Sequence, residues 1–197
     1  MPVIMRSMIP IVTLGIVLGL SGLMPLSAIA KPAAPEELRQ KLLTAVADAT
    51  SFKDRFDAEV WLTDMSRRAE RRVNNIEERL LILKTVHFEA NRVGLSPELV
   101  LAVIDIESRF DRFAISVVGA QGLMQIMPFW KKELDLPDAN LFDVQTNIRF
   151  GCTILKHYID KEKGNMQKGL ARYNGSYGRR KYPDKVFNAL SKIWYQR

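Results

Sequence analysis

Apolar side chains recur at helical spacing through much of the first half of the chain. Between Glu36 and Val93 the sequence contains neither glycine nor proline. The apolar positions there fall into three groups: Leu38, Leu42, Leu43 and Val46; Phe52, Phe56, Val60 and Trp61; and Ile76, Leu80, Leu83 and Val86. Since positions three or four residues apart share one face of an α-helix, this pattern predicts that residues 36–93 are helical.

Residues that favour helix ends divide the second half of the chain. Gly94 is expected to end one helix, and Ser96 with Pro97 to begin the next, because serine caps a helix start and proline fits its first turn. Further helices are expected from Asp143 to about Lys161, from Asn165 to about Tyr173, and from Tyr182-Pro183 to the C-terminus. Residues 111–123 are expected to be irregular and residues 124–135 partly helical. Because no alternating run is long enough for a strand, the predicted fold class is all-α.

The helix expected from Pro97 to about Arg109 is apolar almost all round, which predicts a position at the centre of the domain. Glu107 is a carboxyl group in this apolar setting. Three aliphatic residues lie within about 60° of it around the helix axis: Val100, Val103 and Ile104. Asp105 falls on the opposite side of the same helix.

Burial of the Glu107 carboxyl among aliphatic groups would penalise its charged form and raise its pKa. A general acid that works near neutral pH needs such a raised pKa. The alternative is structural: Glu107 emerges into water near the helix end, or it pairs with Arg109 or Arg112. The helix pattern alone leaves both interpretations open.

The composition is that of a globular protein, with 197 residues of which 47% are hydrophobic and 26% charged. A single cysteine, Cys152, excludes an internal disulfide or a cysteine-based zinc site, and it is expected to be a small buried side chain. His87 and His157 lie far apart in the sequence, so both are predicted to be structural rather than zinc ligands. No cofactor or metal is expected.

Positive charge exceeds negative charge, with 29 Lys and Arg against 22 Asp and Glu and a net charge of +7. Because Arg6 is the one charged residue among residues 1–30, the excess belongs to the rest of the chain. The excess indicates a polyanionic partner. The densest basic cluster is Arg67–Arg72, interpreted as a solvated helix face because acidic residues interleave with it; contact with an anionic surface is the alternative.

The first thirty residues have the order of a secretory signal peptide. Arg6 precedes an apolar stretch from Ile9 to Leu20, and Ala28–Ala30 form a small-residue cleavage site. Cleavage after Ala30 is expected, which predicts export to the periplasm and makes nucleic acid an improbable partner. The alternative is an uncleaved membrane anchor, although the apolar run is short for a spanning helix and is interrupted by proline and glycine.

Four blocks stand out in the second half of the chain: Glu107–Asp111, Ser116–Pro128, Asn147-Ile148 with Gly151, and Ala171–Gly175. In this order and spacing they resemble the signature of the soluble lytic transglycosylase family. The resemblance spans residues 93 to about 190 and implies a single goose-type lysozyme-like helical domain. The expected organisation is a signal peptide at 1–30, an N-terminal helical extension at 31–92 and the catalytic domain at 93–197.

The resemblance also implies an activity. The family cleaves the β-1,4 bond between N-acetylmuramic acid and N-acetylglucosamine in peptidoglycan without consuming water, and leaves a 1,6-anhydromuramoyl end. Glu107 matches the catalytic residue, which acts first as acid and then as base. The positions implied to bind substrate are Ser116, Gly122, Gln125, Met127, Asn147, Tyr173 and Asn174. Tyr173 is further expected to hydrogen-bond the Glu107 carboxyl.

Several of these residues also have a structural interpretation. Met127 could belong to the core, as is expected of Met124; Asn147 could stabilise its helix; and Gly122 could serve only to allow a positive φ angle. Tyr177 and Tyr182 could stack on sugar rings or be ordinary surface residues. The sequence departs from the family pattern at Val117, at Arg172 before the tyrosine, and at Gly175-Ser176, which makes the local shape around Tyr173 the least predictable part of the site.

Two other functions compete with the transglycosylase prediction. One is a hydrolytic muramidase on the same fold, and the other is a wall-binding module without catalysis. The expected partner is the peptidoglycan glycan strand, with cell-envelope or secretion-machinery proteins as further candidates and no nucleic acid. We expect a monomer.

Overall fold

The structure of the protein is a computed structural model that describes residues 55–133 and 135–195, with side chains from Trp61 onwards. The predicted signal peptide, the lead-in after it and the helix expected from Glu36 lie outside the described residues.

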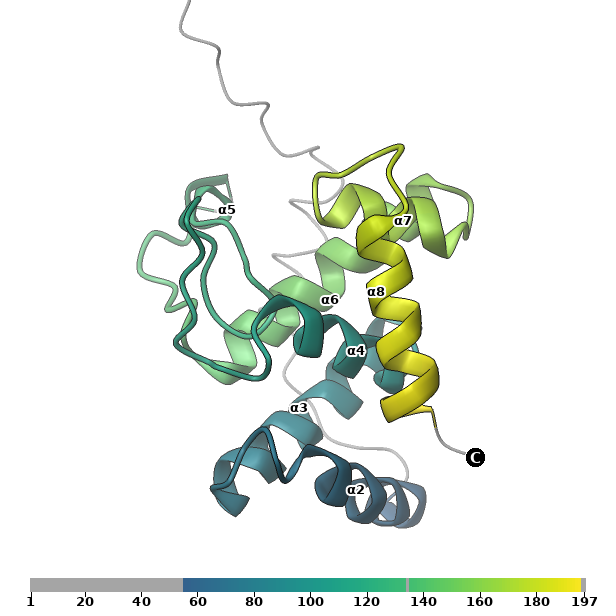
Figure 1. The fold of residues 1–197 in the computed structure, drawn as a ribbon. Helices are drawn as coiled ribbons and strands as arrows, with labels where there is room; N and C mark the ends of the chain where they lie inside the picture. The colour runs from purple at the N-terminus through teal and green to yellow at the C-terminus, as the bar shows by residue number, and fades with distance from the viewer. Residues whose placement is uncertain (1–54, 134, 196–197) are drawn as a thin grey trace, which may run out of the picture. The chain divides into compact units, whose positions relative to one another are not determined.

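Helices form almost all the regular structure of the described part (Figure 1). They are α2 (Arg55–Ala69), α3 (Ile76–Val93), α4 (Pro97–Glu107), α5 (Phe129–Glu133), α6 (Val144–Lys161), α7 (Met166–Tyr173), α8 (Lys181–Ala189) and a π-helical turn, η1 (Leu190–Trp194). Extended pairing among the described residues is limited to two isolated antiparallel bridges, at Ile115 with Gln121 and at Gln121 with Ile126. The all-α prediction is confirmed.

Four of the predicted helix boundaries are confirmed by their caps. Gly94 has φ 71° and its N–H donates to the carbonyls of Ala90 and Asn91, which ends α3. The side chains of Ser96, Asp143 and Asn165 accept from backbone N–H groups three residues further on, which begins α4, α6 and α7. Short-range sequence signals therefore determine these boundaries.

Helix α4 lies in the core, as predicted. Every residue from Leu99 to Ile104 is buried, and α4 packs against α3, α8 and η1. It ends at Glu107, before the predicted end at Arg109, because Arg109 and Phe110 have positive φ angles of 54° and 68° that no α-helix contains.

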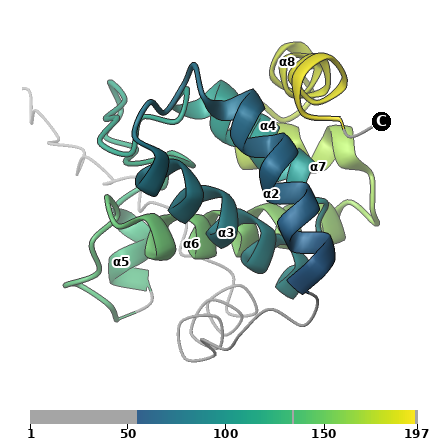
Figure 2. The ribbon, with the colours of Figure 1, turned by 90° about the horizontal axis from the view of Figure 1, so that it is seen from below.

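Helices α2 and α3 lie side by side, with α6 against the other side of α3 (Figure 2). The predicted apolar stripe of α3 is only partly correct. Leu83 and Val86 are buried, but Ile76 is 48% exposed, and Ile82, which the stripe omitted, is fully buried. Ile76 is exposed because it opens the first turn of α3, where the helix has not yet reached the core.

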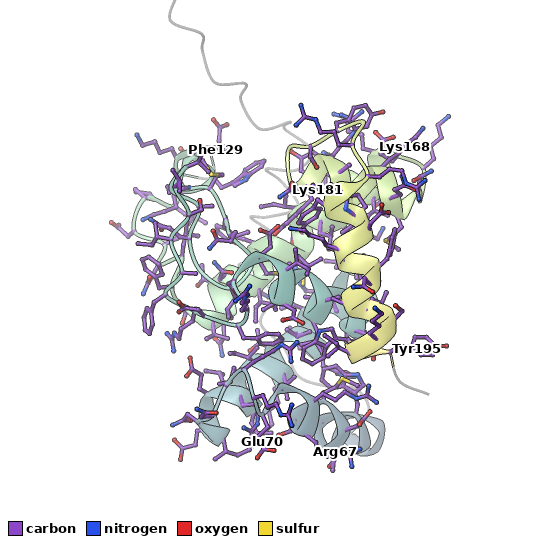
Figure 3. All side chains as sticks on the ribbon, viewed as in Figure 1. Arg67, Glu70, Phe129, Lys168, Lys181 and Tyr195 are labelled. Carbon is purple, nitrogen blue, oxygen red and sulfur yellow. The ribbon has the colours of Figure 1, made fainter. Side chains whose placement is uncertain are left out.

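The basic cluster at the end of α2 is not one solvated face, contrary to the prediction. Arg67 and Glu70 are exposed, and Figure 3 shows Arg67 at the outer edge of α2 and Glu70 directly after the end of this helix. Arg68 and Arg72 instead turn inward: Arg68 donates to the carbonyl of Ile193 at 2.7 Å, and Arg72 pairs with Asp105. None of the described helices is both long enough and apolar enough to cross a membrane.

Candidate active site

Glu107 is the last residue of α4, and its side chain is partly buried. Its Oε1 atom accepts a hydrogen bond of 2.6 Å from the hydroxyl of Tyr182. Burial raises the pKa of Glu107 to about 7, and the hydrogen bond from Tyr182 opposes this rise. Arg112 donates to the carbonyl of Phe142 instead of pairing with Glu107. The geometry therefore favours the predicted buried acid over the structural alternative.

The chain turns sharply after Glu107. The N–H and hydroxyl of Ser108 both donate to the carbonyl of Ile104, which closes the helix end. Arg109 and Phe110 follow in the left-handed region, and Phe110 is only 3% exposed. Because two consecutive non-glycine residues rarely adopt this conformation, surrounding contacts must hold it. Ser108 thus acts as a capping residue.

Two tyrosines flank Glu107, and their roles differ from the prediction. Tyr173, at the end of α7, was expected to hydrogen-bond the Glu107 carboxyl, but its hydroxyl donates to the carbonyl of Met124 at 2.7 Å. Tyr182, in the first turn of α8, is the donor to Glu107. Burial, and then the negative charge of Glu107, raise the pKa of each phenol well above its usual value. Both tyrosines therefore lie close to the carboxyl as protonated phenols.

The interpretation of Tyr182 as an ordinary surface residue is wrong, because Tyr182 is 8% exposed. Stacking of its ring on a sugar stays a prediction. The burial of Tyr182 could have been predicted from its position at the start of an amphipathic helix, because the apolar Val186 follows one turn later. This spacing predicts that Tyr182 faces the core.

The loop before α5 is fixed by Asn147 of α6. Asn147 is 1% exposed; its Oδ1 accepts from the N–H of Met124 at 2.7 Å, and its Nδ2 donates to the carbonyls of Gln121 and Leu141 at 2.9 and 2.7 Å. Gly122 has φ 75°, and a Cβ atom there would lie 2.3 Å from Asn147 Nδ2. The glycine and the asparagine therefore form one structural unit.

Met124 links this loop to the site. It is fully buried, as expected, and a Cβ at Gly151 of α6 would lie 2.2 Å from its Sδ atom, so only glycine leaves room for it. Its carbonyl accepts from Tyr173. Asn147 and Gly151 therefore position the loop that contains Met124, which belongs to the block Ser116–Pro128. Met124 in turn contacts Tyr173 of the block Ala171–Gly175.

Two of the predicted substrate-binding residues, Gly122 and Asn147, are buried. The others are partly or fully exposed: Ser116, Gln125, Met127, Tyr173 and Asn174. Ser116 accepts from the N–H of Ala120 through its hydroxyl oxygen. Gln125 has φ 51° and donates from Nε2 to the carbonyl of Gly122 at 2.9 Å. Met127 packs against the core while partly exposed, and Asn174 is exposed directly after α7.

The remaining candidate side chains are structural. Cys152 is buried, as predicted, and burial raises the pKa of its thiol well above the usual range. His87 lies against Trp61 with ring centroids 5.0 Å apart, and His157 is 5% exposed beside Tyr158. The part of the chain that the structure describes contains no group of three potential metal ligands.

A separate cavity lies between residues 135–139 and the first half of α6. Gln145, Thr146, Arg149 and Phe150 line its α6 side. None of the predicted site residues lines it, so it is distinct from the Glu107 site.

The chain is similar to proteins named as transglycosylases. The family model described as "Transglycosylase SLT domain" matches residues 84–193. The transglycosylase of Enterobacteria phage PRD1 is 30% identical over 118 residues, which covers 56% of this chain and 43% of that protein. The membrane-bound lytic murein transglycosylase F of Desulfosudis oleivorans is 36% identical over 95 residues, which covers 45% of this chain and 20% of that protein.

A solved structure is also similar. An inactive mutant of the lytic transglycosylase Slt from Pseudomonas aeruginosa is 32% identical, covers 48% of this chain and 17% of its own, and has a TM-score of 0.44. The chain spans less than half the length of each of these relatives.

Proposed function

The chain belongs to the transglycosylase SLT domain family, and from this premise we propose that it is an exported lytic transglycosylase of peptidoglycan. It cleaves the β-1,4 bond between N-acetylmuramic acid and N-acetylglucosamine without water and leaves 1,6-anhydromuramoyl ends. The observation that carries this proposal is a partly buried carboxyl, Glu107, whose pKa is raised to about 7 and which accepts from a neutral phenol.

Glu107 performs both proton transfers in the proposed reaction. Its protonated carboxyl donates to the glycosidic oxygen as the bond to the anomeric carbon breaks. The resulting carboxylate takes the proton from the muramoyl C6 hydroxyl, whose oxygen then bonds to the anomeric carbon. Glu107 returns to its protonated form, and no water is consumed.

A single carboxyl suits this reaction, whereas most glycosidases place two across the bond. Asp105, the nearest other carboxyl on α4, is bound to the guanidinium of Arg72 by two hydrogen bonds of 2.7 Å. Asp105 is therefore not available as a second catalytic carboxyl. The first step needs protonated Glu107, so activity is expected to fall as the pH rises through about 7.

The substrate-binding residues remain part of the proposal. We assign direct contact with the glycan strand to five partly or fully exposed positions: Ser116, Gln125, Met127, Tyr173 and Asn174. Gly122 and Asn147 contribute by fixing the backbone from which Gln125 and Met127 project. The hydrogen bonds of the buried Asn147 support this role.

Export and domain organisation are also proposals. A signal peptide at residues 1–30 would deliver the enzyme to the periplasm, where its positive charge suits an anionic wall. Residues 31–92 are proposed as the N-terminal extension and residues 93–197 as the catalytic domain. The family match begins at residue 84, inside α3.

Mass analysis of digested peptidoglycan tests the proposed reaction. Purified protein and its Glu107→Gln variant are incubated with purified wall, and the released fragments are weighed. Anhydro products are lighter by one water than hydrolysis products and are expected only from the wild type. Products that all carry reducing ends would identify a muramidase, and wall binding without release of fragments would identify a binding module.

A further inference from the structure

Helix α2 precedes the segment that matches the family, residues 84–193, yet it contacts the end of the catalytic domain. Arg68 of α2 donates to the carbonyls of Ile193 and Tyr195 at 2.7 and 3.2 Å. Figure 3 shows Tyr195 at the end of the chain that lies toward α2. The contact between α2 and η1 is therefore specific, with side chains of one bound to the backbone of the other.

Arg72, Asp105 and Trp194 form one hydrogen-bonded cluster, which we call the Asp105 cluster. Arg72 donates from Nε and Nη2 to the two oxygens of Asp105, each at 2.7 Å. Trp194 donates from its indole nitrogen to Asp105 Oδ2 at 3.1 Å, and the Arg72 guanidinium lies 5.1 Å from the centre of the indole ring. Trp194 is fully buried and the Asp105 side chain is 9% exposed. Such a paired, largely buried arrangement fixes its members in position.

The Asp105 cluster adjoins the catalytic end of α4. Asp105 precedes Glu107 by two residues, and Phe110 follows it by three. The ring centroids of Phe110 and Trp194 lie 5.2 Å apart. Trp194 therefore contacts α4 before Glu107 in the sequence, at Asp105, and the strained turn after Glu107, at Phe110. The positive φ of Phe110 requires such support from surrounding contacts.

The C-terminal segment holds α4 at both of its opposite faces. Tyr182 at the start of α8 binds Glu107, and Trp194 at the end of η1 binds Asp105. The π turn contributes to this placement: the N–H of Tyr195 donates to the carbonyl of Leu190 at 2.7 Å, and the wider turn changes the direction in which Trp194 projects relative to a continued α-helix.

We propose that the Asp105 cluster positions Glu107 for catalysis, and that Arg72, in the turn directly after α2, is a positioning residue of the active site although it lies outside the family-matched segment. The role of Glu107 in this inference rests on the proposed function. Helix α2 and the turn that follows it thereby support the active site rather than forming an independent extension.

The Asp105 cluster also balances charge near Glu107. The groups that face Glu107 are the neutral phenols of Tyr173 and Tyr182, from α7 and α8, while Asp105 on its own helix is neutralised by Arg72. Loss of Arg72 would leave a negative charge and raise the pKa of Glu107; loss of Asp105 would leave a positive charge and lower it. Because the pair lies on the opposite face of α4 from Glu107, each shift is expected to be small, about 0.3–0.5 unit.

Two single variants test the proposal, Arg72→Gln and Asp105→Asn, with soluble peptidoglycan fragments as substrate. Both should lower kcat about 10-fold while KM changes less than about 2-fold, because Glu107 is displaced and the substrate cleft is not. The alkaline limb of the pH profile should move up for Arg72→Gln and down for Asp105→Asn. Lys156→Gln, which removes an exposed ion pair with Asp160, is the control and should change neither.

A further variant separates charge from position. Arg72→Lys keeps the positive charge but loses the two-pronged hydrogen bonding, so the alkaline limb should return to its wild-type pH while kcat stays lowered. Trp194→Phe keeps a ring against Phe110 and removes the indole donor; it serves if the charge variants fold poorly, and kcat should fall several-fold.

Titration of the Glu107 side-chain carboxyl by NMR gives a readout that does not depend on activity. Opposite shifts in Arg72→Gln and Asp105→Asn would support the proposal even if the wild type released no wall fragments, which would count against the proposed function alone. Shifts in the same direction, no shift, or a loss of activity that only matches the unfolded fraction would overturn it.

Discussion

Two carboxyl groups lie two residues apart on α4 and meet opposite surroundings. Glu107 is partly buried and accepts from the neutral hydroxyl of Tyr182. Asp105 is also largely buried, but it accepts from the cationic Arg72 and from the indole of Trp194. The helix period of about 100° per residue directs them to opposite faces, so one helix carries both.

The difference supplies the transferable proton that the proposed function requires. A cation beside a carboxyl stabilises its charged form, whereas burial beside a neutral donor destabilises it. Arg72, from the turn after α2, is bound on the Asp105 face, and the Glu107 face receives the phenols of Tyr173 from α7 and Tyr182 from α8. Glu107 can therefore remain protonated near neutral pH, while Asp105 acts as a structural anchor.

The largest expected effect comes from making Glu107 unable to donate a proton. Glu107→Gln keeps the shape and the oxygen that accepts from Tyr182, and we expect the rate of anhydro product release to fall about 10³-fold. Initial rates on purified peptidoglycan measure this. Asp160→Asn, at an exposed carboxylate of α6, is the control. A Glu107→Gln rate within tenfold of the wild-type rate would contradict the role of Glu107 as the proton donor.

The other carboxyl should matter most for stability. Asp105→Ala leaves the Arg72 guanidinium without its partner in a mostly buried place, and we expect a loss of about 2–3 kcal/mol in the free energy of unfolding. Urea denaturation measures the loss. The same change at the exposed pair, Asp160→Ala, should cost less than about 0.5 kcal/mol. Equal costs at both sites would show that the Asp105 cluster is not an anchor.

Burial of Glu107 should make the stability of the protein depend on pH. Because the folded-state pKa of Glu107 is about 7 against 4.5 for the free group, the cost of burying its charge is absent below about pH 4.5, grows between pH 4.5 and 7, and is fully present above pH 7. Glu107→Gln should therefore stabilise the protein by about 1–2 kcal/mol at pH 8 and by almost nothing at pH 4. Thermal melts at the two pH values test this; a gain at pH 4 as large as at pH 8 would contradict the raised pKa.

The smallest expected effect concerns which tyrosine serves Glu107. Tyr182→Phe removes a donor that lowers the pKa of the carboxyl, so the alkaline limb of activity should move up by about 0.5–1 unit. Tyr173→Phe removes a hydroxyl that donates to the carbonyl of Met124 and should leave the limb in place. A shift in Tyr173→Phe without one in Tyr182→Phe would reverse the assignment of the two residues.

Local sequence signals predicted the helices well. Gly94, Ser96, Asp143 and Asn165 act within three or four residues of their own positions, so their neighbours in the sequence are enough to identify them. The apolar run of α4 likewise predicted a central helix and a carboxyl among aliphatic groups. The end of α4 was predicted less well, because the positive φ angles of Arg109 and Phe110 depend on contacts from elsewhere.

The sequence by itself thus determined the all-α class, the helix starts, the family blocks and Glu107 as the unusual carboxyl. Only the tertiary structure decided which partners that carboxyl and its neighbour would have. Tyr182 lies 75 positions from Glu107, and Arg72 and Trp194 lie 33 and 89 positions from Asp105. No periodicity or spacing rule reaches so far, because contacts over such separations depend on how whole helices pack. The residues of α4 therefore carry the two carboxyls, and the turn after α2, helix α8 and η1 supply their partners.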